Sequence, residues 1–151
     1  MNPQIEELKR ALLDHKHSGL DGTKPLTEYS FVTATLPGTI PATAANYGIF
    51  FTATFPCSVK AVSMVQTTAG TGAGTVTLQL ERLQGTEAPD AGDELLATAF
   101  NLKATANTVQ EGVLVARKTL TALAPGDRLC LKDVGTLTSV AGLNVTVELQ
   151  Y

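Results

Sequence analysis

The sequence predicts an all-β protein: an antiparallel β-sandwich, jelly-roll-like, preceded by a short N-terminal helix and a turn-rich linker. Two observations lead to this prediction. Most segments after residue 29 are rich in Thr and Val and alternate apolar with polar side chains, which is the period of a strand. Gly, Pro and Asp separate these segments at the spacing typical of β-sandwiches. The length of 151 residues suits one such domain with a real core.

The first residues have a different period. Asn2 can cap a helix over residues 3–14, in which Ile5, Leu8 and Leu12 share one side at coiled-coil spacing. Three turns of helix are only marginally stable alone in water, so this apolar seam needs a partner. The partner is the chain's own β-domain, other copies of the chain around a symmetry axis, or another protein. The sequence leaves these three open.

A cluster of turn-forming residues, among them Gly19, Asp21 and Pro25, follows the helix and ends it. Few contacts are expected to cross such a cluster, which makes it a natural domain boundary. We therefore divide the chain into an N-terminal helical arm and linker, residues 1–28, and a β-sandwich domain, residues 29–151.

Seven segments of the domain are expected to be strands: 29–36, 47–55, 58–67, 75–83, 109–117, 128–132 and 142–151. Pro37 and Gly38 are expected to end the first of them. Residues 95–100 fit a helical turn or a short strand. In the last strand every second residue from Leu143 to Leu149 is apolar, which predicts one buried and one polar face.

Composition and charge exclude several classes of function. A formal net charge of -3 argues against general nucleic-acid binding, which needs Lys and Arg to neutralise phosphates. The first seven residues carry two glutamates where a signal peptide needs basic residues and an apolar run. No apolar run approaches the roughly 20 residues that span a bilayer. We expect a protein made in the cytoplasm that binds neither nucleic acid nor membrane.

Motifs of catalysis are missing from the sequence. The glycine loop 69–74 lacks the Lys and Ser/Thr of a phosphate loop and precedes a strand, so we expect a hairpin connection. Cys57 and Cys130 lie far apart, and two buried free thiols are favoured over one long-range disulfide. No motif assembles a nucleophile, a base and an orienting group, and we therefore expect no enzyme.

Acidic residues gather in the expected loop 85–93 and just after it. Carboxylate pairs such as Glu87/Asp90 and Asp93/Glu94 supply the oxygen ligands that calcium prefers, although the spacing of an EF-hand is missing. The alternative is a solvated surface loop. Asp127 lies at a turn next to an expected strand, and so does Asp133. Both are expected to cap backbone groups.

The two histidines of the chain, His15 and His17, are one residue apart. In an extended segment residues i and i+2 point to the same side, and His15 continues the apolar seam of the helix. Three copies around an axis would offer six imidazole nitrogens, which suits an octahedral first-row transition metal such as iron. The alternative, which spacing alone favours, is a solvated pair of histidines in a turn.

The segment His15-Lys16-His17-Ser18-Gly19 resembles the His-x-His-(Ser/Asp)-Gly segments of bacteriophage tail fibres, spikes and needles. In those trimers such histidines bind iron along the threefold axis. The resemblance implies the same role for His15 and His17. This chain carries one copy of the motif.

The body, over about residues 45–150, resembles small phage virion proteins of the head-decoration and head-fibre type, which have a jelly-roll body. The segments that carry this resemblance are 46–51, 69–78, 105–110 and 126–132. The resemblance implies a non-enzymatic structural protein of the virion, a homotrimer whose arm binds the major capsid protein or another virion protein.

Two alternatives remain at this stage. One keeps the class and moves the site, to a tail-fibre, collar or baseplate component that contacts the host. The other changes the class, to a carbohydrate-binding or hydrolytic β-sandwich module. The absence of Trp and of a paired-carboxylate signature counts against the second.

Overall fold

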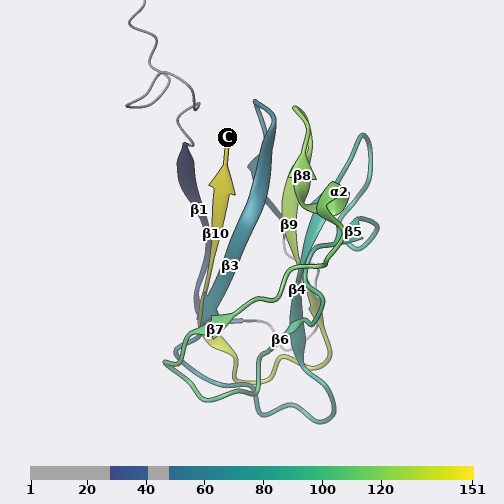
Figure 1. Ribbon diagram of the computed structural model, residues 1–151. Coiled ribbons are helices and arrows are strands. Elements are labelled where there is room, and N and C mark those ends of the chain that lie inside the picture. The colour runs from purple at the N-terminus through teal and green to yellow at the C-terminus, as the bar shows by residue number, and fades with distance from the viewer. Residues whose placement is uncertain (1–27, 41–47) are drawn as a thin grey trace, which may run out of the picture.

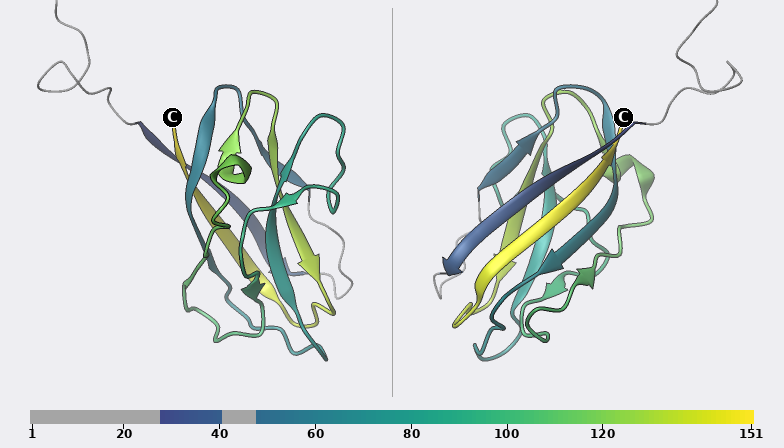
Figure 2. Two further views of the ribbon diagram at one scale, coloured as in Figure 1. Left: turned by 45° about the vertical axis from the view of Figure 1, so that its right-hand side comes forward. Right: turned by 90° about the vertical axis from the view of Figure 1, so that its left-hand side faces the viewer.

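Two antiparallel β-sheets face each other in the computed structural model, which describes residues 28–40 and 48–151 (Figures 1 and 2). The expected N-terminal helix and its linker lie outside the described residues. The two sheets confirm the predicted all-β sandwich.

The first sheet holds β1 (Tyr29–Thr39), β10 (Ala141–Gln150) and β3 (Cys57–Val65), with the short β7 (Gln110–Glu111) and β8 (Ala122–Leu123) both paired with β3. The second sheet holds β2 (Ile49–Thr52), β9 (Arg128–Val134) and β4 (Thr77–Leu83), with β5 (Asp93–Glu94) and β6 (Phe100–Asn101) both paired with β4. One helical turn, α2 (Lys118–Thr121), lies between β7 and β8.

The chain passes from one sheet to the other at most connections. It alternates between the sheets through β1, β2, β3 and β4, and again through β8, β9 and β10. As a result β10 lies between β1 and β3, and β9 lies between β2 and β4. This interleaved antiparallel order is jelly-roll-like, as the sequence predicts.

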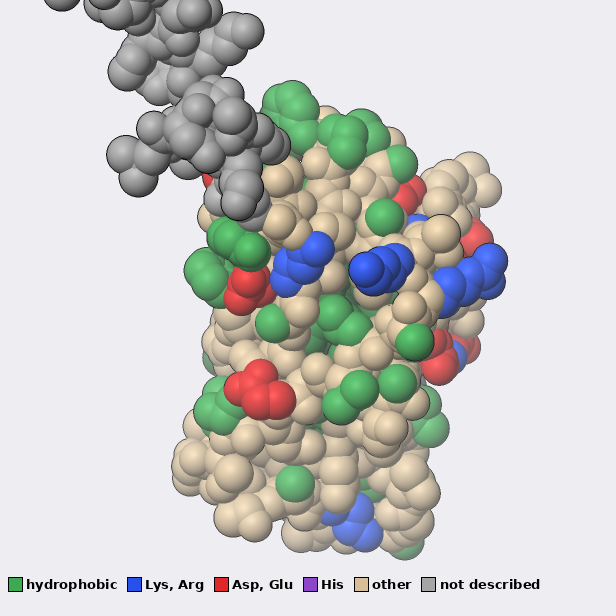
Figure 3. Space-filling model, viewed as in Figure 1, with side chains coloured by type: hydrophobic (Ala, Val, Ile, Leu, Met, Phe, Trp, Pro, Cys, Tyr) green, Lys and Arg blue, Asp and Glu red, His purple; other side chains and the backbone are tan. Residues whose placement is uncertain are grey.

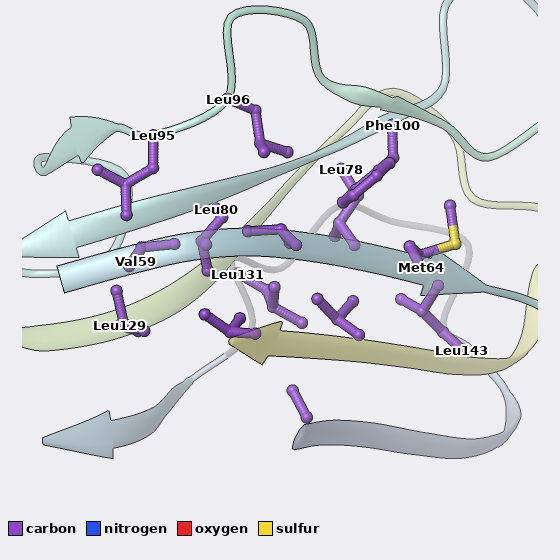
Figure 4. Packing of buried hydrophobic residues seen from close by; sticks show 14 of the residues in the cluster. Val59, Met64, Leu78, Leu80, Leu95, Leu96, Phe100, Leu129, Leu131 and Leu143 are labelled. Carbon is purple, nitrogen blue, oxygen red and sulfur yellow. The ribbon is translucent and has the colours of Figure 1, made fainter. Parts of the chain in front are cut away.

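Apolar side chains from the inner faces of both sheets fill the space between them (Figure 4). Val59 of the first sheet lies near Leu80 and Leu129 of the second, and Leu143 lies further along the same core, near Met64. The expected alternation of β10 is confirmed, since Leu143, Val145, Val147 and Leu149 are all fully buried. Each such side chain contributes about 1.5–3 kcal/mol to folding, so the core determines the stability of the body.

The expected end of the first strand at Pro37 is wrong. β1 continues to Thr39 and shifts its register against β10 between Leu36 and Thr39. Gly38 has a φ of 72°, which lets the backbone bend within the strand where most residues would be strained. The bend allows the next residue, Ile40, to donate a hydrogen bond to Val140 and to enter the core.

Two expected strands are much shorter than predicted. The strand expected at 47–55 is only the four residues of β2, and that expected at 109–117 is only β7. After β7 the chain leaves the first sheet, and Leu114 forms an isolated bridge with Leu96 near the second. Residues 95–100 are likewise a connection that ends at β6. Loops that contribute side chains to a core show the same apolar pattern as strands.

The glycine loop 69–74 is not a hairpin connection, because it joins β3 in one sheet to β4 in the other. It runs against the loop from β9 to β10, which crosses in the opposite direction, and Thr71 donates a backbone hydrogen bond of 2.9 Å to Thr138. A Cβ atom at Gly72 would collide with the carbonyl oxygen of Thr136. The glycines therefore serve close backbone approach between two crossing loops.

Candidate functional site

Two of the sites that the sequence predicts lie outside the described residues. This holds for the apolar seam of Ile5, Leu8 and Leu12 and for the histidine pair, His15 and His17. The structure does place the point at which the segment that carries them joins the body.

This junction lies at one end of the sandwich, beside the last residue of the chain. The backbone nitrogen of Tyr151 donates a hydrogen bond of 2.9 Å to the carbonyl oxygen of Glu28. Because β1 and β10 are antiparallel neighbours, the first residues of β1 lie next to the last residues of β10 (Figure 2). Glu28, the first described residue, and the C-terminal residue therefore lie at the same end.

Exposed aromatic side chains gather at this end. A hollow of about 530 Å³ is lined by Glu28, Ser30, Thr54, Phe55, Pro56 and Tyr151. Phe55 is 68% exposed, Tyr151 is 42% exposed and Tyr29, the first residue of β1, is 53% exposed. Figure 3 shows hydrophobic side chains at the top of the molecule, where Figure 1 places the turn between β2 and β3. We call Glu28, Tyr29, Phe55, Pro56 and Tyr151 the attachment end.

Sequence reasoning missed the attachment end. The sequence predicts strands that contain Tyr29 and Phe55, and aromatic residues are common in strands whether or not they are exposed. The residue next to Phe55 could have indicated its exposure, because Pro56 marks a turn, and β2 has already ended at Thr52. Clustered exposed apolar groups mark surfaces that contact other molecules.

A second cluster, of charged groups, lies on the outer face of the second sheet. The ammonium group of Lys132 is 2.9 Å from the carboxylate of Asp90, 3.3 Å from that of Glu94 and 3.6 Å from that of Glu81. The hydrogen bond to Asp90 holds the pKa of Lys132 above its usual value, and the Glu94 and Glu81 carboxylates add to this rise. Lys132 is therefore positively charged at neutral pH.

The segment of residues 84–94, which ends in β5 and is called loop 84–94 below, covers this face of the sheet, and basic residues hold it in place. Arg82 forms an ion pair of 2.6 Å with Asp93, and Arg128 donates a hydrogen bond of 2.8 Å to the carbonyl oxygen of Gly85. The carboxylates considered for calcium bind groups of the chain itself. Glu87, for example, accepts a hydrogen bond from the backbone nitrogen of Gln84. Within residues 28–40 and 48–151, no group of acidic, Cys or His side chains is arranged to hold a metal ion.

The aspartates expected as caps differ from each other. Asp127 accepts a hydrogen bond of 3.0 Å from the backbone nitrogen of Ala124 and closes the turn before β9, as expected. Asp133 is buried inside β9 and does not lie at a turn.

Both cysteines are free and buried, as the sequence predicts. Burial raises the pKa of Cys130 to about 12, and the carboxylate of Glu81 adds to the rise. Burial and the charge of Asp127 also raise the pKa of Cys57. Neither thiol is ionised at neutral pH, and a thiol that is not ionised is a poor nucleophile.

Among the described residues, no helix is long and apolar enough to cross a membrane. The chain matches no protein-family model and no curated protein sequence.

Proposed function

We propose that this chain is a non-enzymatic structural protein of a bacteriophage particle, a homotrimer that decorates the capsid. The N-terminal arm, residues 1–28, anchors the protein on the major capsid protein or on another virion protein, and the β-sandwich projects outward. The resemblance of the His-x-His segment and of the body to phage virion proteins supports this proposal.

The observation that carries the proposal furthest is the arrangement of the attachment end. The arm joins the body beside exposed Tyr29, Phe55 and Tyr151. A protein held by its arm presents this end first to whatever holds it. Contact there would remove these aromatic side chains from water, at roughly 25 cal/mol for each Å² of apolar surface buried.

Particle binding tests the proposal. Purified full-length protein is mixed with particles that lack this protein, alongside a variant without residues 1–26 and a Phe55→Ser variant. We expect the full-length chain to bind, the truncated chain to fail and Phe55→Ser to bind more weakly. A Val109→Ser variant, which changes an exposed residue remote from the attachment end in sequence, is the control. Equal binding by the truncated chain would contradict the anchoring role.

Copy number separates the capsid from the tail. Hundreds of copies per particle indicate a capsid lattice, whereas a handful indicates a tail-fibre, collar or baseplate component. Quantitative mass spectrometry of purified particles gives this number. Absence of the chain from purified particles would contradict both locations.

The proposed trimer rests on the apolar seam of Ile5, Leu8 and Leu12. The helix that would carry this seam is too short to be stable alone, so we propose that three copies pack their seams together. Light scattering of the full-length chain measures its mass in solution. We expect three copies for the native chain and fewer for a variant in which these three residues are replaced by Ser. A monomer both in solution and on the particle would contradict a homotrimer.

A further inference from the structure

A gap in the pairing of β3 opens one edge of the first sheet. β3 pairs with β8 through Cys57 and Ser58, and with β7 through Ser63 and Met64. Between these two short ladders, no strand in the described part of the chain pairs with residues 59–61 on this edge.

The gap arises because the chain turns away from β3 after β7. Val115 donates a backbone hydrogen bond of 2.9 Å to Leu95, and the chain returns to β3 only at β8. This detour leaves a hollow of about 440 Å³ beside the open edge. Its aliphatic lining residues are Val59, Leu114, Val115 and Ala116, and its polar ones are Ser58, Lys60, Lys118 and Thr121. A hollow of this size is within the range of ligand sites.

The cations that have no partner gather around this hollow. Seven Lys and Arg residues lie in the described residues, and four of them bind acidic side chains, the amide oxygen of Gln84 or backbone carbonyl oxygens. The charged groups of Lys60, Arg117 and Lys118 form no hydrogen bond or ion pair with residues 28–40 and 48–151. Lys60 and Lys118 line the hollow, and Arg117 is next to Lys118 in the chain. Figure 3 shows basic side chains across the upper half of this face.

We propose that this hollow binds an extended, acidic segment of a partner polypeptide. The segment adds to the open edge of β3 at residues 59–61 and forms main-chain hydrogen bonds there, as in strand addition to a sheet edge. Its apolar side chains pack against the aliphatic lining residues of the hollow, and its carboxylates lie near Lys60 and Lys118. Charges of this kind select the partner and its orientation more than they add affinity.

The open edge favours a polypeptide over an acidic polysaccharide. The open backbone of residues 59–61, where β3 shifts its register against β10, offers main-chain donors and acceptors that an extended peptide can pair with. The lining residues include no aromatic ring on which a sugar could stack. Burying hydroxyl groups against the aliphatic lining residues would cost free energy, so a polysaccharide should bind weakly there. The hollow shares no residue with the attachment end, and its test needs no phage particle.

The probe is a short synthetic peptide that alternates Glu with Val, and its binding to the full-length protein is measured by calorimetry at low and high salt. We expect binding that weakens as salt rises. A Lys60→Glu/Lys118→Glu variant should lose roughly tenfold or more in affinity, since like charges would then face the peptide. Lys103→Glu, an exposed lysine that does not line this hollow, should bind as the native protein does. Thermal melting of each variant shows that it is folded.

Two further probes test the mode and class of binding. The same peptide with N-methylated backbone amides cannot donate main-chain hydrogen bonds, so we expect it to bind much more weakly. A sulfated polysaccharide of similar charge should bind weakly or not at all. Unchanged affinity in Lys60→Glu/Lys118→Glu, equal affinity for the N-methylated peptide, or preference for the polysaccharide would each overturn the proposal.

Discussion

The ammonium group of Lys132 on β9 lies 3.6 Å from a carboxylate oxygen of Glu81, a β4 residue that is fully buried beneath loop 84–94. That oxygen, Oε1, accepts no hydrogen bond from the described residues, so Lys132 is its charge partner. The other carboxylate oxygen accepts a hydrogen bond of 2.8 Å from the backbone nitrogen of Asp90. A buried carboxylate thus joins two strands of the second sheet to the loop that covers them.

Replacing Lys132 by Met should destabilise the fold. The change leaves the buried charge of Glu81 without its partner and frees the carboxylates of Asp90 and Glu94. Removing one partner of a buried ion pair costs about 3–5 kcal/mol of stability. Because Lys132 is partly exposed, we expect a loss at the low end, about 3 kcal/mol. Urea unfolding of the native protein and the variant measures this difference.

Two controls accompany Lys132→Met. Lys103→Met removes an exposed lysine that only contacts the carbonyl oxygen of Gly74, and it should change stability by less than about 0.5 kcal/mol. The double variant Glu81→Met/Lys132→Met removes both charges, so we expect it to recover much of the loss. If Lys132→Met is as stable as the native protein, the pair has no structural role.

Stability should fall in alkaline solution because of the Cys130 thiol. Its pKa is about 12 in the folded protein, against an ordinary value of 9.0. A pKa that folding raises gives stability that is complete below pH 9 and is lost as pH rises towards about 12, because only the unfolded thiol ionises in this window. The loss amounts to at most about 1.4 kcal/mol per pH unit.

The comparison of the native protein with Cys130→Ala isolates this effect. The variant starts from a lower stability, since it loses buried volume, but its stability should fall less steeply between pH 9 and pH 11. Urea unfolding at a series of pH values measures the slopes. The raised pKa of Lys132 acts in the same direction from its ordinary value of 10.5 upward, and this effect is common to both proteins. Parallel slopes would show that Cys130 does not titrate in this range.

The sequence predicts best where one residue pattern has one physical solution. From Leu143 to Leu149 strict alternation can only place one face in a core, and β10 has that structure. The apolar pattern at residues 109–117 fits either a strand or a loop that packs some side chains on the core. The structure has the loop, with a short β7, and Val109 and Val113 are more than half exposed. β4 also alternates, which suggests a solvated polar face, yet Glu81 on that face is covered by loop 84–94. No local pattern shows that a distant loop will fold over a strand.

Removing residues 1–26 should leave a folded β-protein. β1 begins at Tyr29, and Glu28 is the first residue with a described contact, the hydrogen bond from Tyr151. Removing residues 1–40 instead deletes β1, including Ala34 of the core, and exposes one edge of β10. Thermal melting followed by circular dichroism should therefore show a cooperative transition for the shorter deletion and none for the longer. Loss of the transition in both would place the arm within the folding unit.

The last prediction concerns the histidine pair, which lies outside the described residues: His15 and His17 of three chains meet at the threefold axis and bind a transition metal such as iron. His15 continues the seam of Leu8 and Leu12, so an axial seam brings three copies within reach of one another. His17 is two residues further on, and an extended backbone there points its ring to the same side. Six neutral imidazoles then suit an octahedral first-row ion.

Elemental analysis of the trimer, purified without chelator, measures the metal. We expect about one ion per three chains in the native protein and none in a His15→Ala/His17→Ala variant. Binding should weaken as pH falls through about 6.5, because protonated imidazole is no ligand. A Lys16→Ala variant, which changes the residue between the two histidines, is the matched control and should keep its metal. Metal content that is unchanged in the double variant, or metal-free native trimer, would leave His15 and His17 as a solvated pair in a turn.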